Sequence, residues 1–225
     1  MFINDVLFHA AELVALIQTP FDYDQVCALD FAPDSIDLWF YDIWVARDAN
    51  GEKMRNRYPY AVVPESVKRM EAGLPFAVYT CWNGVTVFRA EPFFRGLRFR
   101  NPRDTGQECL HGEAYQMSED LHYMGYHKIA INPVMRVAYN LETFLRTRWL
   151  ETEQTKRYHS WPLHTHILPD YFPEPHGCLP VEPEWPGPPI EYTCCDADGT
   201  GLKAKWHECH KRTYQPIDLE FLLNN

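Results

Sequence analysis

Apolar residues up to position 149 recur in two patterns, one helical and one extended. Between residues 6 and 18 they fall at helical spacing, and the pattern stops before Pro20, which predicts an amphipathic helix. Similar patterns predict helices over 64–72, 113–124 and 141–149. Short apolar runs bounded by turn residues predict strands at 1–3, 26–31, 38–45, 76–80, 85–88, 129–131 and 136–138. Helices interleaved with strands indicate the α/β class.

The second half of the chain changes in character. Eight prolines lie between Pro169 and Pro189, too many for a helix or a central strand, so this stretch is expected to be an extended, semi-rigid arm. The sequence therefore divides into a domain over 1–168, the arm over 169–189, and a cysteine-containing tail over 190–225.

The amino-acid composition and net charge of the chain limit the classes of protein to which it can belong. The chain has 225 residues, of which 46% are hydrophobic and 15% aromatic, as in a globular protein with a real core. The formal charge of −10 argues against a nucleic-acid partner held by phosphate contacts. No run of eighteen apolar residues and no signal-peptide pattern occurs, so no membrane segment is expected in this chain.

Seven cysteines are many for a cytosolic protein, and four of them (Cys178, Cys194, Cys195 and Cys209) lie in the last 48 residues. We favour a disulfide from Cys194 or Cys195 to Cys209, which would imply an oxidising compartment. The alternative is a zinc site made by the tail cysteines with His207 and His210, although their spacing does not match a zinc finger. A loose group of histidines could complete a metal sphere: His159, His164 and His166.

Asp5 is the first candidate for chemistry, because it closes a short apolar run and precedes a predicted helix. A carboxylate in this place could bind Mn²⁺ or Mg²⁺, both of which accept oxygen ligands. Alternatively, Asp5 is the N-cap of the helix over 6–18.

Two further segments could bind a sugar. Asp42, Trp44, Arg47 and Asp48 combine carboxylates for hydroxyl groups with a ring for an apolar sugar face, although a salt bridge at a strand end is an alternative reading. In the second segment, residues 81–84, Trp82 offers a stacking surface and Asn83 precedes a glycine that permits a close backbone approach. The alternative there is an ordinary type I′ hairpin.

Glu113 and Asp120 are candidate catalytic acids, because both fall on one face of the helix predicted over 113–124. Glu113 at the helix start could act as a base or as an electrostatic stabiliser of a cationic centre. The alternative is an acidic first turn with Glu119 and Asp120 on the surface. Upstream, the arginines could neutralise a diphosphate or simply form a solvated face; they are Arg89, Arg95, Arg98, Arg100 and Arg103.

Five ordered motifs together resemble the capsule-associated fungal alpha-1,3-mannosyltransferases of glycosyltransferase family 69. The match spans roughly residues 2–140. The motifs are Asn4-Asp5-Val6, Tyr41-Asp42-Ile43-Trp44-Val45-Ala46-Arg47-Asp48, Tyr79-Thr80-Cys81-Trp82-Asn83-Gly84, Gly112-Glu113-Ala114 with Asp120-Leu121, and Asn132-Pro133-Val134-Met135-Arg136-Val137-Ala138-Tyr139.

The resemblance implies a GT-A-like α/β domain, a mixed sheet with flanking helices, and transfer of mannose from GDP-mannose to a mannose-containing glycan in alpha-1,3 linkage with retention. It implies a divalent cation at Asp5, catalysis by Glu113 and Asp120, and substrate contacts from the segments at 42–48 and 82–83. Family members carry a membrane anchor and a nucleotide-binding half before the Asn-Asp-Val strand. The chain is therefore expected to be an N-terminally truncated form of a Golgi-lumenal protein.

Two other classes of function stay open at this stage. A truncated, catalytically inactive paralogue could bind glycans or pair with an intact transferase. A zinc-stabilised interaction module is the weaker option.

Overall fold

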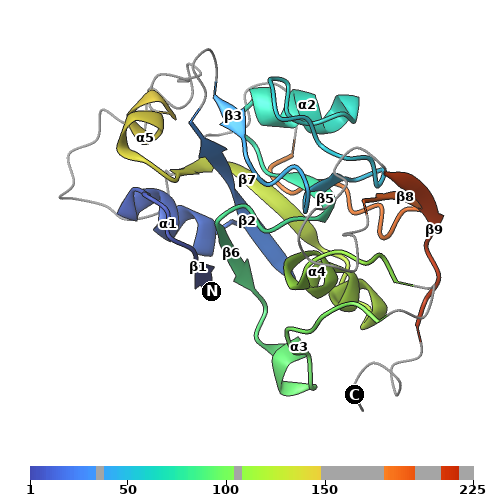
Figure 1. Cartoon of the computed structure of the whole chain (residues 1–225). Helices are drawn as coiled ribbons and strands as arrows, with labels where there is room; N and C mark the ends of the chain where they lie inside the picture. Colours follow the sequence, from blue (N-terminus) through green and yellow to red (C-terminus); the bar gives the residue numbers. More distant parts are fainter. Residues whose placement is uncertain (34–37, 104–107, 148–179, 196–208, 218–225) are drawn as a thin grey trace.

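The computed structural model describes residues 1–33, 38–103, 108–147, 180–195 and 209–217. They form a seven-stranded mixed sheet with helices on both faces and a separate two-stranded hairpin (Figure 1). The order of the strands in the sheet is β1-β6-β2-β7-β5-β4, and β3 pairs with β2. The predicted mixed α/β class is confirmed.

The central pair, β2 (Gln25–Ala32) and β7 (Ile129–Ala138), is parallel, and the other pairs are antiparallel. Strands β5 (Phe76–Thr80) and β6 (Val85–Phe88) match the predicted ranges, and β1 is Phe2–Ile3. Where two strands were predicted over 129–138, β7 is one strand with an irregular register, since Cys27 pairs with Ile131 but Leu29 pairs with Arg136. Pro133, which has no amide hydrogen, lies inside the irregularity.

The helices are α1 (Ala10–Ile17), α2 (Pro64–Glu71), α3 (Glu91–Phe94), α4 (Glu113–Tyr123) and α5 (Leu141–Thr147). Helix α1 begins four residues later than predicted, because the His9 side chain accepts a hydrogen bond from the Ala11 amide and caps it. The alternative that Asp5 is the N-cap of this helix is therefore wrong.

The segment predicted as one strand over 38–45 is instead β3 (Trp39–Phe40), a turn, and β4 (Arg47–Asp48). The turn forms because the Asp42 carbonyl accepts hydrogen bonds from the amides of Val45 and Ala46, at 3.0 and 2.9 Å. The side chains of residues 38–45 therefore do not alternate between the two faces of a sheet. Leu38, the first of them, and Val45, the last, pack in different core clusters.

The hairpin predicted around Asn83-Gly84 is also absent. Both residues have positive φ, 56° and 70°, as the turn chemistry predicts. However, the strands that they connect do not pair, because β2 and β7 lie between β5 and β6. The turn therefore carries the chain across the central strands rather than back along a neighbour.

Alternation along β2 divides the core into two layers. Val26 and Ala28 face a cluster that includes Leu16 of α1, whereas Leu29 and Phe31 face the larger cluster that includes residues of α2 and α4. The tail hairpin, β8 (Glu191–Cys194) and β9 (His210–Thr213), packs on this body near β5 (Figure 1), where Arg47 of β4 donates a hydrogen bond to the Thr193 carbonyl of β8. Among the described residues, no helix has the length and apolarity needed to cross a membrane.

Candidate functional site

The site is organised around a carboxylate at the end of the central strand. Asp30 is the sixth residue of β2 and is fully buried. One of its oxygens accepts a hydrogen bond from the backbone amide of Asp42 (3.2 Å), and the other accepts one from the Tyr139 hydroxyl (3.0 Å). Burial raises the pKa of Asp30 well above its usual value, and the neighbouring Asp42 raises it further.

Asp42 lies at the start of the turn between β3 and β4, and its side chain is 8% exposed. The Asn83 backbone amide donates a hydrogen bond to Asp42 Oδ2 at 2.9 Å. Burial raises the pKa of Asp42 to about 6, while hydrogen bonds from the Asn83 and Gly84 amides oppose this rise. Two acids thus share one small region, and no lysine or arginine among the described residues forms an ion pair with either.

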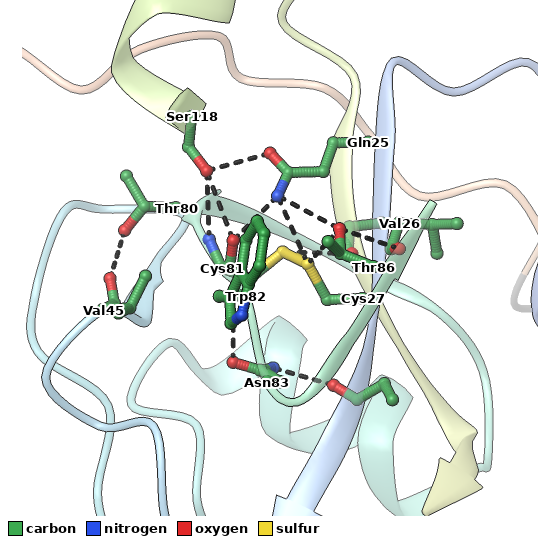
Figure 2. Close-up of a disulfide and its surroundings, with 12 residues drawn as sticks. Gln25, Val26, Cys27, Val45, Thr80, Cys81, Trp82, Asn83, Thr86 and Ser118 are labelled. Carbon is green, nitrogen blue, oxygen red and sulfur yellow. Dashed lines mark hydrogen bonds between the residues drawn. A yellow bond between two sulfur atoms is a disulfide. The ribbon is translucent and has the colours of Figure 1, made fainter. Parts of the chain in front are cut away.

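Asn83 is held from both sides, and Figure 2 shows how. Its side-chain amide donates to the Ala28 carbonyl at 2.7 Å, while its side-chain oxygen accepts from the Trp82 amide at 3.3 Å. The preceding Cys81 forms a disulfide with Cys27 of β2, so the turn is covalently tied to the central strand. Asn83 itself is fully buried, so the main role of its side chain is to stabilise the turn.

Trp82 is partly buried and lies in a cluster of aromatic rings. Its ring lies 5.8 Å from those of Phe2 and Phe99, centroid to centroid, and both of these phenylalanines are more than a third exposed. The cluster presents apolar ring surface beside the Asn83 turn, which is the surface type that stacks on a sugar ring.

Asp5 is exposed and lies in a segment held against the same end of the sheet. The Asn4 amide donates to the Gly84 carbonyl at 2.8 Å, and Leu7 exchanges backbone hydrogen bonds with Ala138. Among the described residues, no group of three or more His, Cys, Asp or Glu side chains is placed to hold a metal ion. A nucleotide-bridging Mg²⁺ usually takes one or two carboxylates plus substrate phosphates, and the predicted metal contact of Asp5 stays a prediction.

Glu113 is the exposed first residue of α4. The preceding residue, Gly112, lies beside the Trp44 ring, since a β-carbon added to this glycine would be 3.8 Å from that ring. Trp44 lies in the turn that Asp42 begins, and its ring contacts that of His111 at 4.4 Å. The turn over 42–46 therefore connects the Asn83 turn with the beginning of α4.

Arg47 forms no ion pair with Asp42 among the described residues, although both belong to one motif. It is fully buried and donates to the carbonyls of Trp44 (2.9 Å) and Thr193 (2.5 Å), and it stacks over the Tyr115 ring at 5.4 Å. Burial lowers its pKa. These contacts hold the tail hairpin to the body. The predicted sugar contact of Arg47 stays a prediction.

Asp48 is likewise fully buried. Its carboxylate accepts hydrogen bonds from the amides of Val62 and Val63 and from the Ser66 hydroxyl, at 2.7, 2.8 and 2.6 Å. These donors lie at the start of α2, so Asp48 acts as its cap from outside the helix. The predicted sugar contact of Asp48 also stays a prediction.

Asp120 is buried and forms an ion pair with Arg100 at 2.6 Å, which Glu108 shares at 2.7 Å. The alternative that Asp120 and Glu119 lie on the surface is wrong, because both residues are at most 1% exposed. The arginines of this stretch do not converge on one site, since Arg89 pairs instead with Asp24 at 2.8 Å. The catalytic prediction for Asp120 stays a prediction.

The tail cysteines form disulfides rather than a zinc site. Cys109 pairs with Cys194, and Cys195 pairs with Cys209. The predicted tail disulfide is therefore confirmed with Cys195 as the partner of Cys209. A zinc site using these cysteines is excluded. The predicted histidine group (His159, His164 and His166), together with His207, lies outside the described residues.

Sequence analysis assigned no role to Asp30 or Tyr139. A signal for both is present in the sequence. Asp30 ends an apolar strand in the same manner as Asp5, and Tyr139 ends the last of the five motifs. Only the register of β2 against β7, which pairs Asp30 with Val137, brings these two residues together.

Comparison with known proteins identifies related sequences. Residues 1–120 match the model of a family described as Cryptococcal mannosyltransferase 1. The alpha-1,3-mannosyltransferase CMT1 of Cryptococcus neoformans var. neoformans serotype D is 26% identical over 159 residues, which cover 62% of this chain and 33% of that protein. The chain thus matches about a third of the length of this curated relative. No solved structure matches.

Proposed function

The chain belongs to the Cryptococcal mannosyltransferase 1 family, and from that premise we propose that it is a glycosyltransferase that moves mannose from GDP-mannose to a mannose-containing acceptor. The proposed product has an alpha-1,3 linkage formed with retention. The single observation that carries the proposal is the turn over 42–46, which is hydrogen-bonded to the Asn83 turn at one end and packs its Trp44 ring against His111, beside the start of α4, at the other. Segments that are far apart in sequence thus converge at one edge of the sheet.

The proposed roles follow the exposure of each side chain. Asp5 is exposed and would share a divalent cation with the donor diphosphate, which that ion neutralises when bound. Glu113 is exposed at a helix start and would stabilise the cationic centre that develops at the anomeric carbon. Asp42 and the Trp82 ring would contact sugar, with Trp44 and Asn83 shaping the two turns. Retention then requires either a carboxylate nucleophile or front-face departure and attack.

The proposed location is a lumenal, oxidising compartment such as the Golgi. The support for it is the three disulfides, because such bonds persist in secretory compartments and are rare in reducing ones.

The proposal is tested first by calorimetry of GDP-mannose with the purified chain, with and without Mn²⁺. Metal-dependent binding that GDP displaces is the expected result, followed by detection of mannosyl transfer to an α-linked mannobiose. Binding of the sugar acceptor without transfer under any metal condition would replace the enzyme with a glycan-binding paralogue.

Variants then test the individual roles. We expect Asp5→Ala and Glu113→Ala to lower transfer by at least about a hundredfold, as removal of a positioned charge commonly does. Glu65→Ala is the matched control, because Glu65 is also an exposed acid in the first turn of a helix. Full activity of either test variant would remove that residue from the mechanism.

A further inference from the structure

Asp30 and Tyr139 have no role in the mechanism proposed above, although both are attached to Asp42. Asp30 accepts the Asp42 amide on one oxygen and the Tyr139 hydroxyl on the other. Tyr139 is in turn fixed at its backbone, where its amide donates to the Phe31 carbonyl at 3.3 Å. The Tyr139 ring also packs against that of Tyr41 at 4.7 Å.

A buried acid in this place is costly for the fold. An apolar side chain at the end of β2 would fill the core without desolvation, whereas a carboxylate must be satisfied by hydrogen bonds or protonated. The Asp30 carboxylate is satisfied by groups that belong to the site rather than to the core. What it achieves is orientation, since it holds the backbone of Asp42 while the Asn83 amide holds the Asp42 side chain.

The chemical character of the groups at the end of β2 favours one kind of ligand. Asp42 has no cationic partner among the described residues, so its ionised carboxylate would repel a diphosphate. A neutral polyol is suited instead, because its hydroxyl groups donate to carboxylates. The ring cluster of Phe2, Trp82 and Phe99 beside the Asn83 turn adds an apolar face for stacking.

We propose that Asp30 and Tyr139 are positioning residues that set the Asp42 carboxylate for the hydroxyl groups of the acceptor sugar, not of the nucleotide donor. This inference rests on the proposed transferase function and specifies which of its two substrates meets the end of β2. Gly84 strengthens it, because a β-carbon there would lie 3.1 Å from Val6 and 3.5 Å from Asp30, so the turn is seated directly on the strand end.

The test compares Tyr139→Phe with Tyr41→Phe in steady-state transfer. Both changes remove one hydroxyl from neighbouring rings, but only the Tyr139 hydroxyl bonds Asp30. For Tyr139→Phe we expect the KM for α-linked mannobiose to rise about tenfold, which is the loss of one hydrogen bond to a charged or polar group. The KM for GDP-mannose should stay within about twofold. Tyr41→Phe should leave both values unchanged.

The Asp30 variants separate positioning from folding. Asp30→Asn keeps an oxygen for the Asp42 amide and should retain more acceptor affinity than Asp30→Ala, with thermal unfolding recorded for each. Equal KM increases for both substrates, or no increase in either variant series, would overturn the inference.

Direct titration of mannobiose, followed by NMR, distinguishes the failure of this inference from failure of the proposed function. If the parent chain transfers no mannose but binds mannobiose, and Tyr139→Phe binds it about tenfold more weakly, the positioning role stands while the transferase proposal fails. If the parent binds no mannobiose, or Tyr139→Phe binds it equally well, the positioning role is overturned.

Discussion

The end of β2 and the junction beneath the tail hairpin are two buried polar clusters that share a single segment, residues 41–48. At the first, Asp30 and Asp42 meet without a cationic partner among the described residues, and exposed Asp5 lies in the segment beside them. At the second, Arg47 is enclosed by carbonyls and aromatic rings and binds the tail. One motif therefore contains residues with two different tasks.

The difference teaches how to weigh residues within a motif. Polar side chains that are fully buried and saturated with internal partners, such as Arg47 and Asp48, fix the scaffold. Asp42 is also mostly buried, but it keeps a small exposed fraction of 8%, through which it can still meet a ligand. The comparison makes four predictions about which changes affect stability and which leave it intact.

The largest expected effect belongs to Arg47→Ala. Removing this guanidinium takes the side-chain donor away from the carbonyls of Trp44 and Thr193, so we expect a loss of about 4 kcal/mol in the free energy of unfolding. Urea denaturation measures it. Arg146→Ala, which breaks a half-exposed i,i+4 pair with Glu142, should cost no more than about 0.5 kcal/mol. A loss below about 1 kcal/mol for Arg47→Ala would show that the tail junction is not a structural centre.

The next effect is a pH dependence at the same junction. Burial raises the pKa of Glu119 from 4.5 to about 7, against hydrogen bonds from Tyr79 and Tyr192 that lower it. The folded state thus holds a proton more tightly than the unfolded chain. The stability that this proton confers is complete below pH 4.5 and is lost as the pH rises through 7, by about 3 kcal/mol in total.

Glu119→Gln isolates this contribution. In urea titrations at a series of pH values, the stability of the parent relative to the variant should therefore fall by about 3 kcal/mol as the pH rises from 4.5 through 7. Burial lowers the pKa of both His111 and His122 to about 3, so they contribute the opposite slope, with stability lost as the pH falls from 6.5 towards 3. That slope is common to both proteins and cancels in their difference. Parallel curves would contradict the assignment to Glu119.

A smaller effect is expected where Asp48 caps α2. Ser66→Ala removes one 2.6 Å hydrogen bond to the Asp48 carboxylate and should cost about 1.5 kcal/mol in guanidinium unfolding. Lys68→Ala, on the exposed side of the same helix, serves as the control and should stay within about 0.5 kcal/mol of the parent. Equal losses in the two variants would mean that Asp48 does not stabilise the helix start.

The smallest effect on stability is expected at the rim. Asp5→Asn and Glu113→Gln alter exposed side chains, so each should change the free energy of unfolding by less than about 0.5 kcal/mol. Transfer activity, by contrast, should fall sharply in both. A large loss of stability in either variant would place that residue with Arg47 and Asp48 instead.

Much of the fold could be read from sequence, because its elements obey local rules. The ranges of β5 and β6 and the ends of α2 and α4 follow from apolar spacing and from the glycines at 73 and 125. The segment over 38–45 could not be read in this way. Its apolar content suits a strand, but the bonds from the Val45 and Ala46 amides to Asp42, together with the Tyr41 amide bond to Asp30, make it a turn.

The site could be predicted only in part, because its key pairings are long-range. Nothing local to Asn83-Gly84 reveals that the flanking strands are separated by two others, so a hairpin is the natural but wrong inference. Similarly, the sequence around Arg47 does not show that its main acceptor is Thr193, 146 residues away. Asp30 is visible in the sequence as an acid closing a strand, yet its partner Tyr139 is the residue that follows the parallel strand β7.

The three disulfides have a consequence for how the chain matures. Their loops do not overlap, since 27–81 closes before 109–194 begins, and 195–209 follows. In an oxidising compartment, Cys27 and Cys81 would emerge before the five later cysteines of this sequence, so the bond that seats the Asn83 turn can form without competition from those thiols. Cys109, in contrast, meets Cys178 before its native partner Cys194 arrives. Mispairing during biogenesis should therefore concentrate among the tail cysteines, whose native pairing would depend on a disulfide isomerase. The disulfide at the turn near the end of β2 should form earlier.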